Sequence, residues 1–148
     1  MVVVYTMTLS EYILKRNGVP VGHSSSLKNM LLRSFGAGSF AGFWKYWNPI
    51  WGFYLWKYIY KPLKKRMPRA FALLLTFAFC GFLHDLVIML LRRDFALLFT
   101  PWFSVMALFI VISEVLNIRY FSYSLAMRTI INLTSIGLCF ALSYPVQL

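Results

Sequence analysis

Residues 43 to 85 decide the fold of this chain, and they read FWKYWNPIWGFYLWKYIYKPLKKRMPRAFALLLTFAFCGFLHD. The first half of this stretch is rich in aromatic rings and contains one Asn-Pro pair. A basic hinge follows from residue 57 to residue 69, and after it comes an apolar run long enough to cross a bilayer. That run carries one imidazole, His84, with a carboxylate, Asp85, beside it. Because a titratable side chain inside an apolar span is energetically costly, we expect His84 to have a specific role.

The composition of the chain points to a membrane protein. The 148 residues suffice for one domain, and 60% of them are hydrophobic while only 13% are charged. Soluble domains carry about 25% charged residues, and disordered chains have low hydrophobicity, so both classes are excluded. We therefore predict an all-α membrane protein that forms a single membrane domain over residues 1–148.

Apolar runs predict about three transmembrane helices, at residues 70–91, 95–116 and about 126–144. The first two runs have the roughly 20 residues that a bilayer requires, and the third is the weakest. Residues 43–69 form an aromatic and basic segment, which suits an interfacial or re-entrant helix because Trp and Tyr concentrate where membrane meets water. Residues 1–42 are mixed in character, and we expect them to be cytoplasmic or interfacial.

The Asn-Pro pair within the aromatic segment predicts the start of a helix. Asn48 can cap the free backbone N–H groups, and Pro49 fits the first helical turn. Pro62 should then stop the helix near Tyr60. Asn48 also has a second interpretation, in which its amide donates a hydrogen bond to a substrate carbonyl or oxyanion. Both interpretations stay open at this point.

The positive charge is distributed very unevenly along the chain. The formal net charge is +11, and eleven of the fifteen basic residues lie before Ala70. Directly upstream of apolar spans, such charges hold their end of the protein in the cytoplasm, so we expect no nucleic-acid partner. With Arg119 and Arg128 the N-terminal side carries thirteen basic residues, against Arg92 and Arg93 on the other side. This asymmetry predicts a cytoplasmic N-terminus and a C-terminus outside. We expect an integral protein of the bacterial inner (cytoplasmic) membrane.

His84 lies on a helical stripe of small or weakly polar side chains. Thr76, Cys80 and His84 follow one another at steps of four residues, with Gly81 beside them. We interpret this stripe as a slot through which a substrate reaches a neutral imidazole acting as general base. The alternative is that His84 bonds to a neighbouring helix and only pins packing. Asp85 faces elsewhere, and we expect it to pair with a basic group or to reach the outer interface.

The remaining candidates have mainly structural interpretations. Neither Cys80 nor Cys139 has the spacing of a disulfide framework or of a zinc site, so no metal site is predicted. The basic hinge sets topology and touches anionic lipid; it can also hold the phosphates of a soluble donor. Its candidate donor-binding residues are Lys57, Lys61, Lys64, Lys65, Arg66 and Arg69.

Three motifs together resemble the core of the membrane-bound O-acyltransferases. They are FWKYWNP (residues 43–49), YIYKPL (58–63) and TFAFCGFLHD (76–85), and the resemblance covers roughly residues 36–90. It implies that an acyl group moves from acyl-CoA, a substrate rather than a bound cofactor, to a hydroxyl-bearing lipid or other acceptor. It also implies that His84 is the general base and that Asn48 assists.

Members of that family are longer than this chain and enclose a reaction chamber with more spans. We therefore expect either a homo-oligomer or a partner membrane subunit to complete the walls, with membrane lipids around them. The alternative to catalysis is a non-catalytic membrane subunit, or a lipid-binding assembly protein, that retains the motif.

Overall fold

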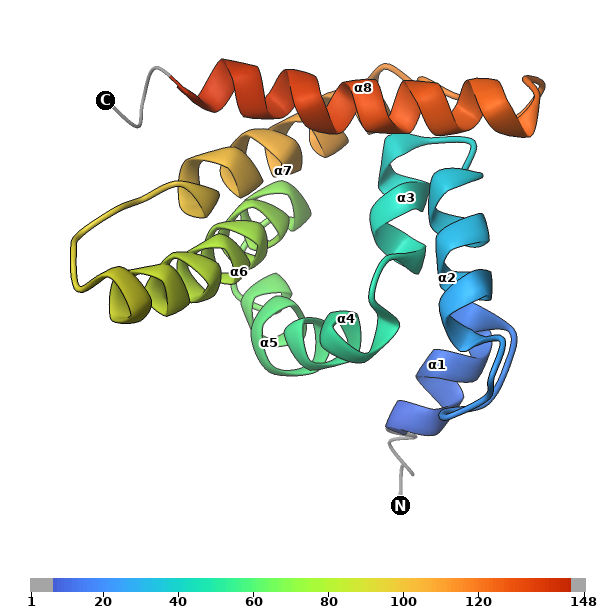
Figure 1. Cartoon of the computed structure of the whole chain (residues 1–148), viewed down its shortest axis with the longest axis horizontal. Helices are drawn as coiled ribbons and strands as arrows, with labels where there is room; N and C mark the ends of the chain where they lie inside the picture. Colours follow the sequence, from blue (N-terminus) through green and yellow to red (C-terminus); the bar gives the residue numbers. More distant parts are fainter. Residues whose placement is uncertain (1–6, 145–148) are drawn as a thin grey trace.

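The computed structural model describes residues 7–144, and this part of the chain is helical without any strand. The all-α class predicted from the sequence is therefore confirmed. In Figure 1, α8 runs along one side of the molecule, next to α7 and close to the start of α3. The elements in chain order are α1 (Leu9–Asn17), α2 (Ser26–Phe35), α3 (Phe40–Tyr46), α4 (Pro49–Leu55), the π-helix η1 (Trp56–Tyr60), α5 (Lys61–Lys64), α6 (Arg69–Arg92), α7 (Phe99–Val115) and α8 (Leu125–Ser143).

The aromatic segment is broken into two arms at Asn48. Helix α3 ends before this residue and α4 begins directly after it, with Asn48 as N-cap and Pro49 in the first turn. The predicted helix start is therefore confirmed. The predicted stop at Pro62 is wrong, because the helical path continues to Lys64. The wider π turns of η1 precede Pro62, and they accommodate a residue that lacks an N–H and that would clash with the preceding turn of an α-helix.

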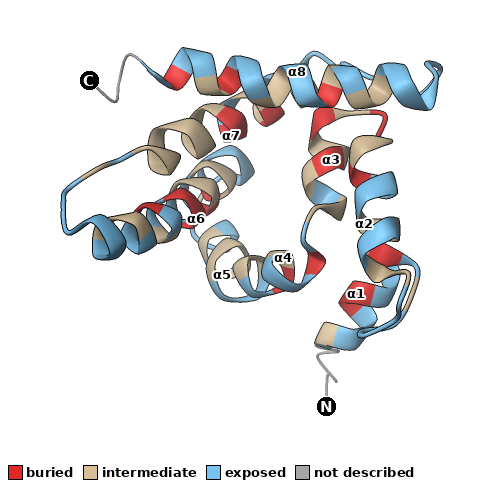
Figure 2. Ribbon diagram, in the orientation of Figure 1, coloured by how far each residue is buried: buried red, intermediate tan, exposed pale blue. Residues whose placement is uncertain are grey.

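Helices α6 and α8 are long and apolar enough to cross a membrane by length and composition. Helix α7 has 17 residues and is shorter, because it begins at Phe99 and not at residue 95 as predicted. Figure 2 shows that exposed residues cover the outer sides of α6 and α8, where a lipid environment would suit them. On α6 the exposed apolar stripe comprises Phe71, Leu75, Phe79, Phe82, Leu86 and Leu90.

The core lies where α3, α7 and α8 meet. Phe40, Met106, Ile110 and Cys139 form a buried cluster there, and the ring of Phe40 packs edge-on against Phe109 with 5.1 Å between centroids. Helices α6 and α7 make the most extensive contact in the described chain, and they run side by side in Figure 1. The aromatic N-terminal half is thereby joined to the apolar C-terminal half.

One buried amide fastens α8 to segments far away in the sequence. The Asn132 side chain is fully buried. Its Nδ2 group donates to the carbonyl oxygens of Phe35 (3.1 Å) and Ala37 (3.0 Å), and its Oδ1 atom accepts from the Tyr120 hydroxyl at 2.6 Å. Burial raises the pKa of Tyr120 to about 12, so this hydroxyl stays protonated and can donate. Because a buried polar group left without a partner costs about 1–3 kcal/mol, this junction strongly favours the closed arrangement.

Candidate active site

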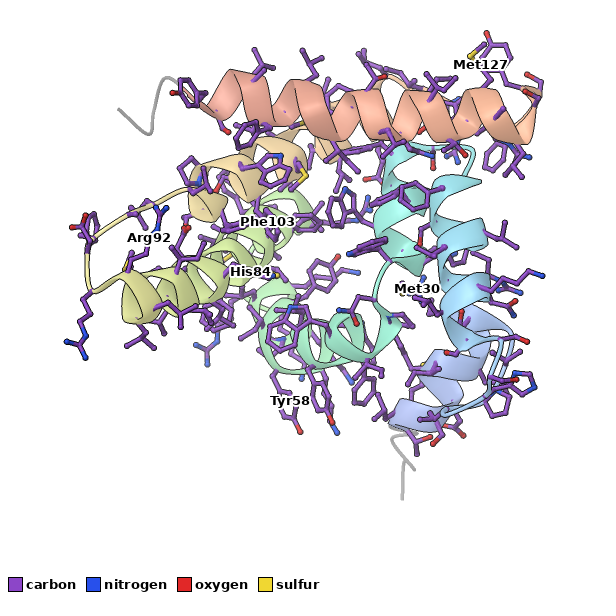
Figure 3. The ribbon with its side chains drawn as sticks, in the orientation of Figure 1. Met30, Tyr58, His84, Arg92, Phe103 and Met127 are labelled. Carbon is purple, nitrogen blue, oxygen red and sulfur yellow. The ribbon has the colours of Figure 1, made fainter. Side chains whose placement is uncertain are left out.

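A central cavity of about 1230 Å³ is lined by residues from every described helix except α5. His84 and Asn48 both contribute to its wall, and so do Cys80 and Thr76. The structure therefore brings the two residues singled out from the sequence to one cavity. Figure 3 shows His84 on α6 beside Phe103 on α7 at the inner side of the molecule, whereas Tyr58 points away from the centre.

The imidazole of His84 is oriented by its own helix. Its Nδ1 atom lies 2.7 Å from the carbonyl oxygen of Cys80, one turn earlier. Because a carbonyl oxygen can only accept, Nδ1 carries the proton, and in the neutral ring Nε2 keeps its lone pair. The rings of Phe99 and Phe103 pack against the imidazole, each with 5.3 Å between centroids. The side chain is exposed, so a substrate in the cavity can reach it.

Asn48 uses one end of its side chain for structure. Its backbone is left-handed, with φ 41° and ψ 70°, a conformation that asparagine tolerates better than most residues. Its Oδ1 atom accepts from the backbone N–H of Trp51 at 3.3 Å and so caps α4. Among residues 7–144 its Nδ2 group has no hydrogen-bond partner. Asn48 is therefore a cap through its oxygen and an available donor through its nitrogen.

Trp51 joins the two candidates, and sequence reasoning missed it. Its indole N–H donates to the Cys80 sulfur at 3.2 Å, and its backbone N–H donates to Asn48. His84 bonds the backbone carbonyl of the same Cys80, so separate hydrogen bonds link Asn48, Trp51, Cys80 and His84 in turn. The available signal was the position of Trp51 three residues after a predicted cap, where a capping side chain bonds the backbone.

Two expectations about α6 need correction. The space beside Gly81 is not open to a substrate, because a Cβ atom there would lie 2.5 Å from the carbonyl oxygen of Phe99 in α7. Asp85 neither pairs with a basic group nor reaches an interface, because it is 1% exposed. Its carboxylate instead accepts from the backbone N–H groups at the start of α7 and from the Thr100 hydroxyl. Both residues serve the contact between α6 and α7.

The basic hinge lies mostly outside the cavity. Of its six candidate residues only Arg69 lines the cavity wall, and its guanidinium forms an ion pair with Glu114 at 2.9 Å. The ammonium of Lys57 lies over the rings of Phe53 and Tyr58, and that of Lys61 lies over Trp56. The remaining three, all exposed, are Lys64, Lys65 and Arg66.

The cavity nevertheless has a strongly cationic lining. Glu114 is the only acidic residue among the described residues that line it. These cations lie far apart in the sequence, so no local pattern could have grouped them. The lining residues with a positive charge are Arg16, Arg33, Lys45, Arg69, Arg119 and Arg128. Such a lining suits a ligand with several negative charges.

Metal-binding groups are absent from residues 7–144, where no three His, Cys, Asp or Glu side chains gather in a way that could hold an ion. The two cysteines, Cys80 and Cys139, are both free and buried. The chemistry available in the cavity is therefore that of an oriented imidazole, an amide donor and a set of cations.

An aromatic helix pair and an apolar helix that present an asparagine and a histidine to one cavity define a membrane-embedded site. The sequence profile of the MBOAT, membrane-bound O-acyltransferase, family matches residues 4–110. The chain therefore belongs to this family of membrane-integral acyltransferases. Comparisons with curated proteins and with solved structures gave no significant match.

Proposed function

We propose that this protein transfers an acyl group from acyl-CoA to a hydroxyl group of a lipid or other acceptor, with His84 as general base. The observation that carries the proposal is the bond from Nδ1 of His84 to the Cys80 carbonyl, which leaves Nε2 as the free basic nitrogen at a cavity wall. Family membership supplies the reaction class.

In the reaction His84 takes one proton from the acceptor and later gives it to the leaving group. The acceptor hydroxyl gives its proton to Nε2 of His84 while its oxygen bonds to the carbonyl carbon of the thioester. The tetrahedral intermediate then expels the thiolate of CoA as the carbon–sulfur bond breaks. The imidazolium returns the proton to that sulfur, so the products are an acyl ester and free CoA thiol, and His84 is neutral again.

Asn48 has the donor that this chemistry requires. Negative charge develops on the carbonyl oxygen during attack, and a preoriented N–H stabilises it most in a site with little water. The Nδ2 group of Asn48 is available because capping of α4 uses only Oδ1. We assign this amide to the substrate carbonyl.

The donor's phosphates are assigned to the cations near the cavity. Arg69 is the residue of the basic hinge that also lines the cavity wall. We place the phosphates between Arg69 and the cavity arginines, with Lys57, Lys61, Lys64, Lys65 and Arg66 drawing the anionic donor toward the membrane surface. In this arrangement the N-terminus is cytoplasmic, as the charge asymmetry of the chain favours. The protein resides in the bacterial inner membrane. A second copy of the chain or a partner subunit completes the walls of the cavity.

Turnover of radiolabelled acyl-CoA by the purified protein, with a total lipid extract as acceptor, tests the proposal. We expect His84→Ala to lower turnover by about 10²- to 10⁴-fold, the usual contribution of general base catalysis. His23→Ala is the matched control, because His23 is the other histidine of the chain and lies in an exposed turn away from the cavity. Equal turnover by the wild-type protein and both variants would contradict the proposal.

A further inference from the structure

The carboxylate of Asp85, in α6, caps the N-terminus of the neighbouring helix α7. Its Oδ1 atom accepts from the backbone N–H groups of Leu98 (2.8 Å) and Phe99 (2.7 Å). Its Oδ2 atom accepts from the backbone N–H (2.7 Å) and the hydroxyl (2.6 Å) of Thr100. The residue in the N-cap position of α7, Leu98, provides no capping side chain. Asp85 therefore accepts from N–H groups at the start of α7, where the backbone donors have no partner within their own helix.

Gly81 allows the start of α7 to approach the backbone of α6 closely enough for these hydrogen bonds to Asp85. It precedes Asp85 by one helical turn on the same face of α6, and a Cβ atom at Gly81 would lie 2.8 Å from the Cα atom of Thr100. The first turn of α7 is thus seated directly on the α6 backbone. An ionised carboxylate at this position also interacts favourably with the dipole of α7.

The same turn of α7 carries an aromatic ring that contacts His84. The Phe99 ring lies 5.3 Å from the imidazole, and Phe103, one turn further on, lies at the same distance. Phe99 donates its backbone N–H to Asp85 while its ring contacts the residue that precedes Asp85 in the sequence. The position of both rings relative to His84 therefore depends on the carboxylate that holds the turn.

We infer that Asp85 is a positioning residue for the imidazole of His84, an inference that rests on the proposed function. By fastening the first turn of α7 to α6, the carboxylate holds Phe99 and Phe103 against the ring. The rings restrict rotation of the imidazole and so preserve the bond from Nδ1 to the Cys80 carbonyl. His84 then presents Nε2 as the base in nearly every molecule, rather than in a fraction of them.

Imidazole ¹⁵N NMR tests the positioning without reference to activity. In a His23→Gln background the chain has a single histidine, His84. We expect that protein to show the Nδ1–H tautomer, and Asp85→Asn to show a mixture of tautomers or averaged shifts. Asp94→Asn is the control, because Asp94 is exposed and, within residues 7–144, accepts only from the adjacent Phe95 backbone. A spectrum of Asp85→Asn identical to that of the control overturns the inference.

Kinetics provide the second measurement. Asp85→Asn should lower kcat about tenfold or more with little change in KM for acyl-CoA, because the ground-state binding groups are untouched. Thr100→Val removes one of the four hydrogen bonds, so it should give a smaller loss of kcat that Thr100→Ser restores. This pair of Thr100 variants keeps the test decisive even if Asp85→Asn fails to fold.

A fall in kcat with the Nδ1–H tautomer of His84 intact also overturns the inference, since the role of Asp85 would then be structural only. If the wild-type protein shows no turnover of acyl-CoA, the proposed function is contradicted. The NMR measurement still decides whether Asp85 positions the imidazole of His84.

Discussion

At the scale of single residues, structural and chemical roles fall on different atoms of the same side chain. Asn48 caps α4 through Oδ1 and keeps Nδ2 available. His84 bonds its own helix through Nδ1 and keeps Nε2 available. The sequence allowed either a cap or a donor at Asn48, and either packing or base catalysis at His84. The geometry makes these alternatives compatible, because each bond that orients the side chain uses a different atom from the one that we propose takes part in the reaction.

Two substitutions separate the roles of Asn48. Asn48→Asp keeps an acceptor for the Trp51 N–H and a residue type tolerant of the left-handed backbone, so we expect nearly normal thermal stability. Turnover should nevertheless fall about tenfold or more, because the amide donor is lost. Asn48→Ala should show the same loss of turnover and also a stability loss of about 1–3 kcal/mol, from the missing cap and the backbone strain.

Thermal unfolding in detergent measures the capping role of Asn48, and acyl-CoA turnover measures its role as a hydrogen-bond donor. Full turnover by Asn48→Asp would show that the amide nitrogen has no part in the reaction, and Asn48 would then be a cap alone.

At the scale of elements, the pairing of α6 with α7 positions the candidate base. The pair depends on a glycine that permits close approach and on a carboxylate that accepts from the α7 terminus. Both residues lie within the motif at residues 76–85 that first singled out His84, yet their partners are found in another helix. The sequence therefore indicated which part of α6 matters, but not that this part contacts the start of α7.

Gly81→Ala tests the close approach. Its new methyl group would meet the carbonyl oxygen of Phe99 at 2.5 Å, so one helix must shift, and we expect a loss of about 1–3 kcal/mol of stability from overpacking. Gly137→Ala in α8 is the matched control, because apart from the adjoining residues and backbone of its own helix no described atom lies within 4 Å of its added carbon. That variant should be as stable as the wild type or gain up to about 1 kcal/mol, since Ala favours a helix. Equal melting temperatures for the two variants would contradict the tight seating of α7.

At the scale of the whole molecule, segments distant in sequence enclose one cavity. Asn132 in α8 bonds the carbonyl oxygens of Phe35 and Ala37, and Tyr120 bonds both the Asn132 side chain and, through its backbone N–H, the Gly38 carbonyl. These bonds hold the N-terminal half of α8 and the turn before it against the connection between α2 and α3. The cavity and its cationic lining therefore depend on contacts between residues 35–38 and residues 120–132.

Thiol labelling in whole cells tests the orientation proposed for this assembly. Ser24, between α1 and α2, and Asp94, between α6 and α7, are both exposed. We expect a membrane-impermeant maleimide to label Asp94→Cys from outside the inner membrane, and Ser24→Cys only after permeabilisation, because positively charged segments stay in the cytoplasm. The native cysteines are buried, so the wild-type chain serves as the unlabelled control. The reverse pattern of labelling would overturn the orientation.

The sequence by itself determined the helical class, two of the three long helices to within one residue, and the cap at Asn48. The sequence predicts spans at 70–91 and about 126–144, and the structure has apolar helices at Arg69–Arg92 and Leu125–Ser143. Local rules sufficed there, because hydropathy and capping depend on neighbours along the chain. The profile of the family likewise rests on motifs contained within residues 4–110.

Only the tertiary structure decided where α7 begins, which cations line the cavity, and how His84 is held. Helix α7 starts at Phe99 because its free N–H groups bond Asp85 of another helix, a partner that no local pattern reveals. Arg16 and Arg128 reach the same cavity from opposite ends of the chain. The physical reason is the same in each case. The direction of a side chain and the partner it meets are set by packing between helices, whereas the sequence specifies only the preferences of each helix.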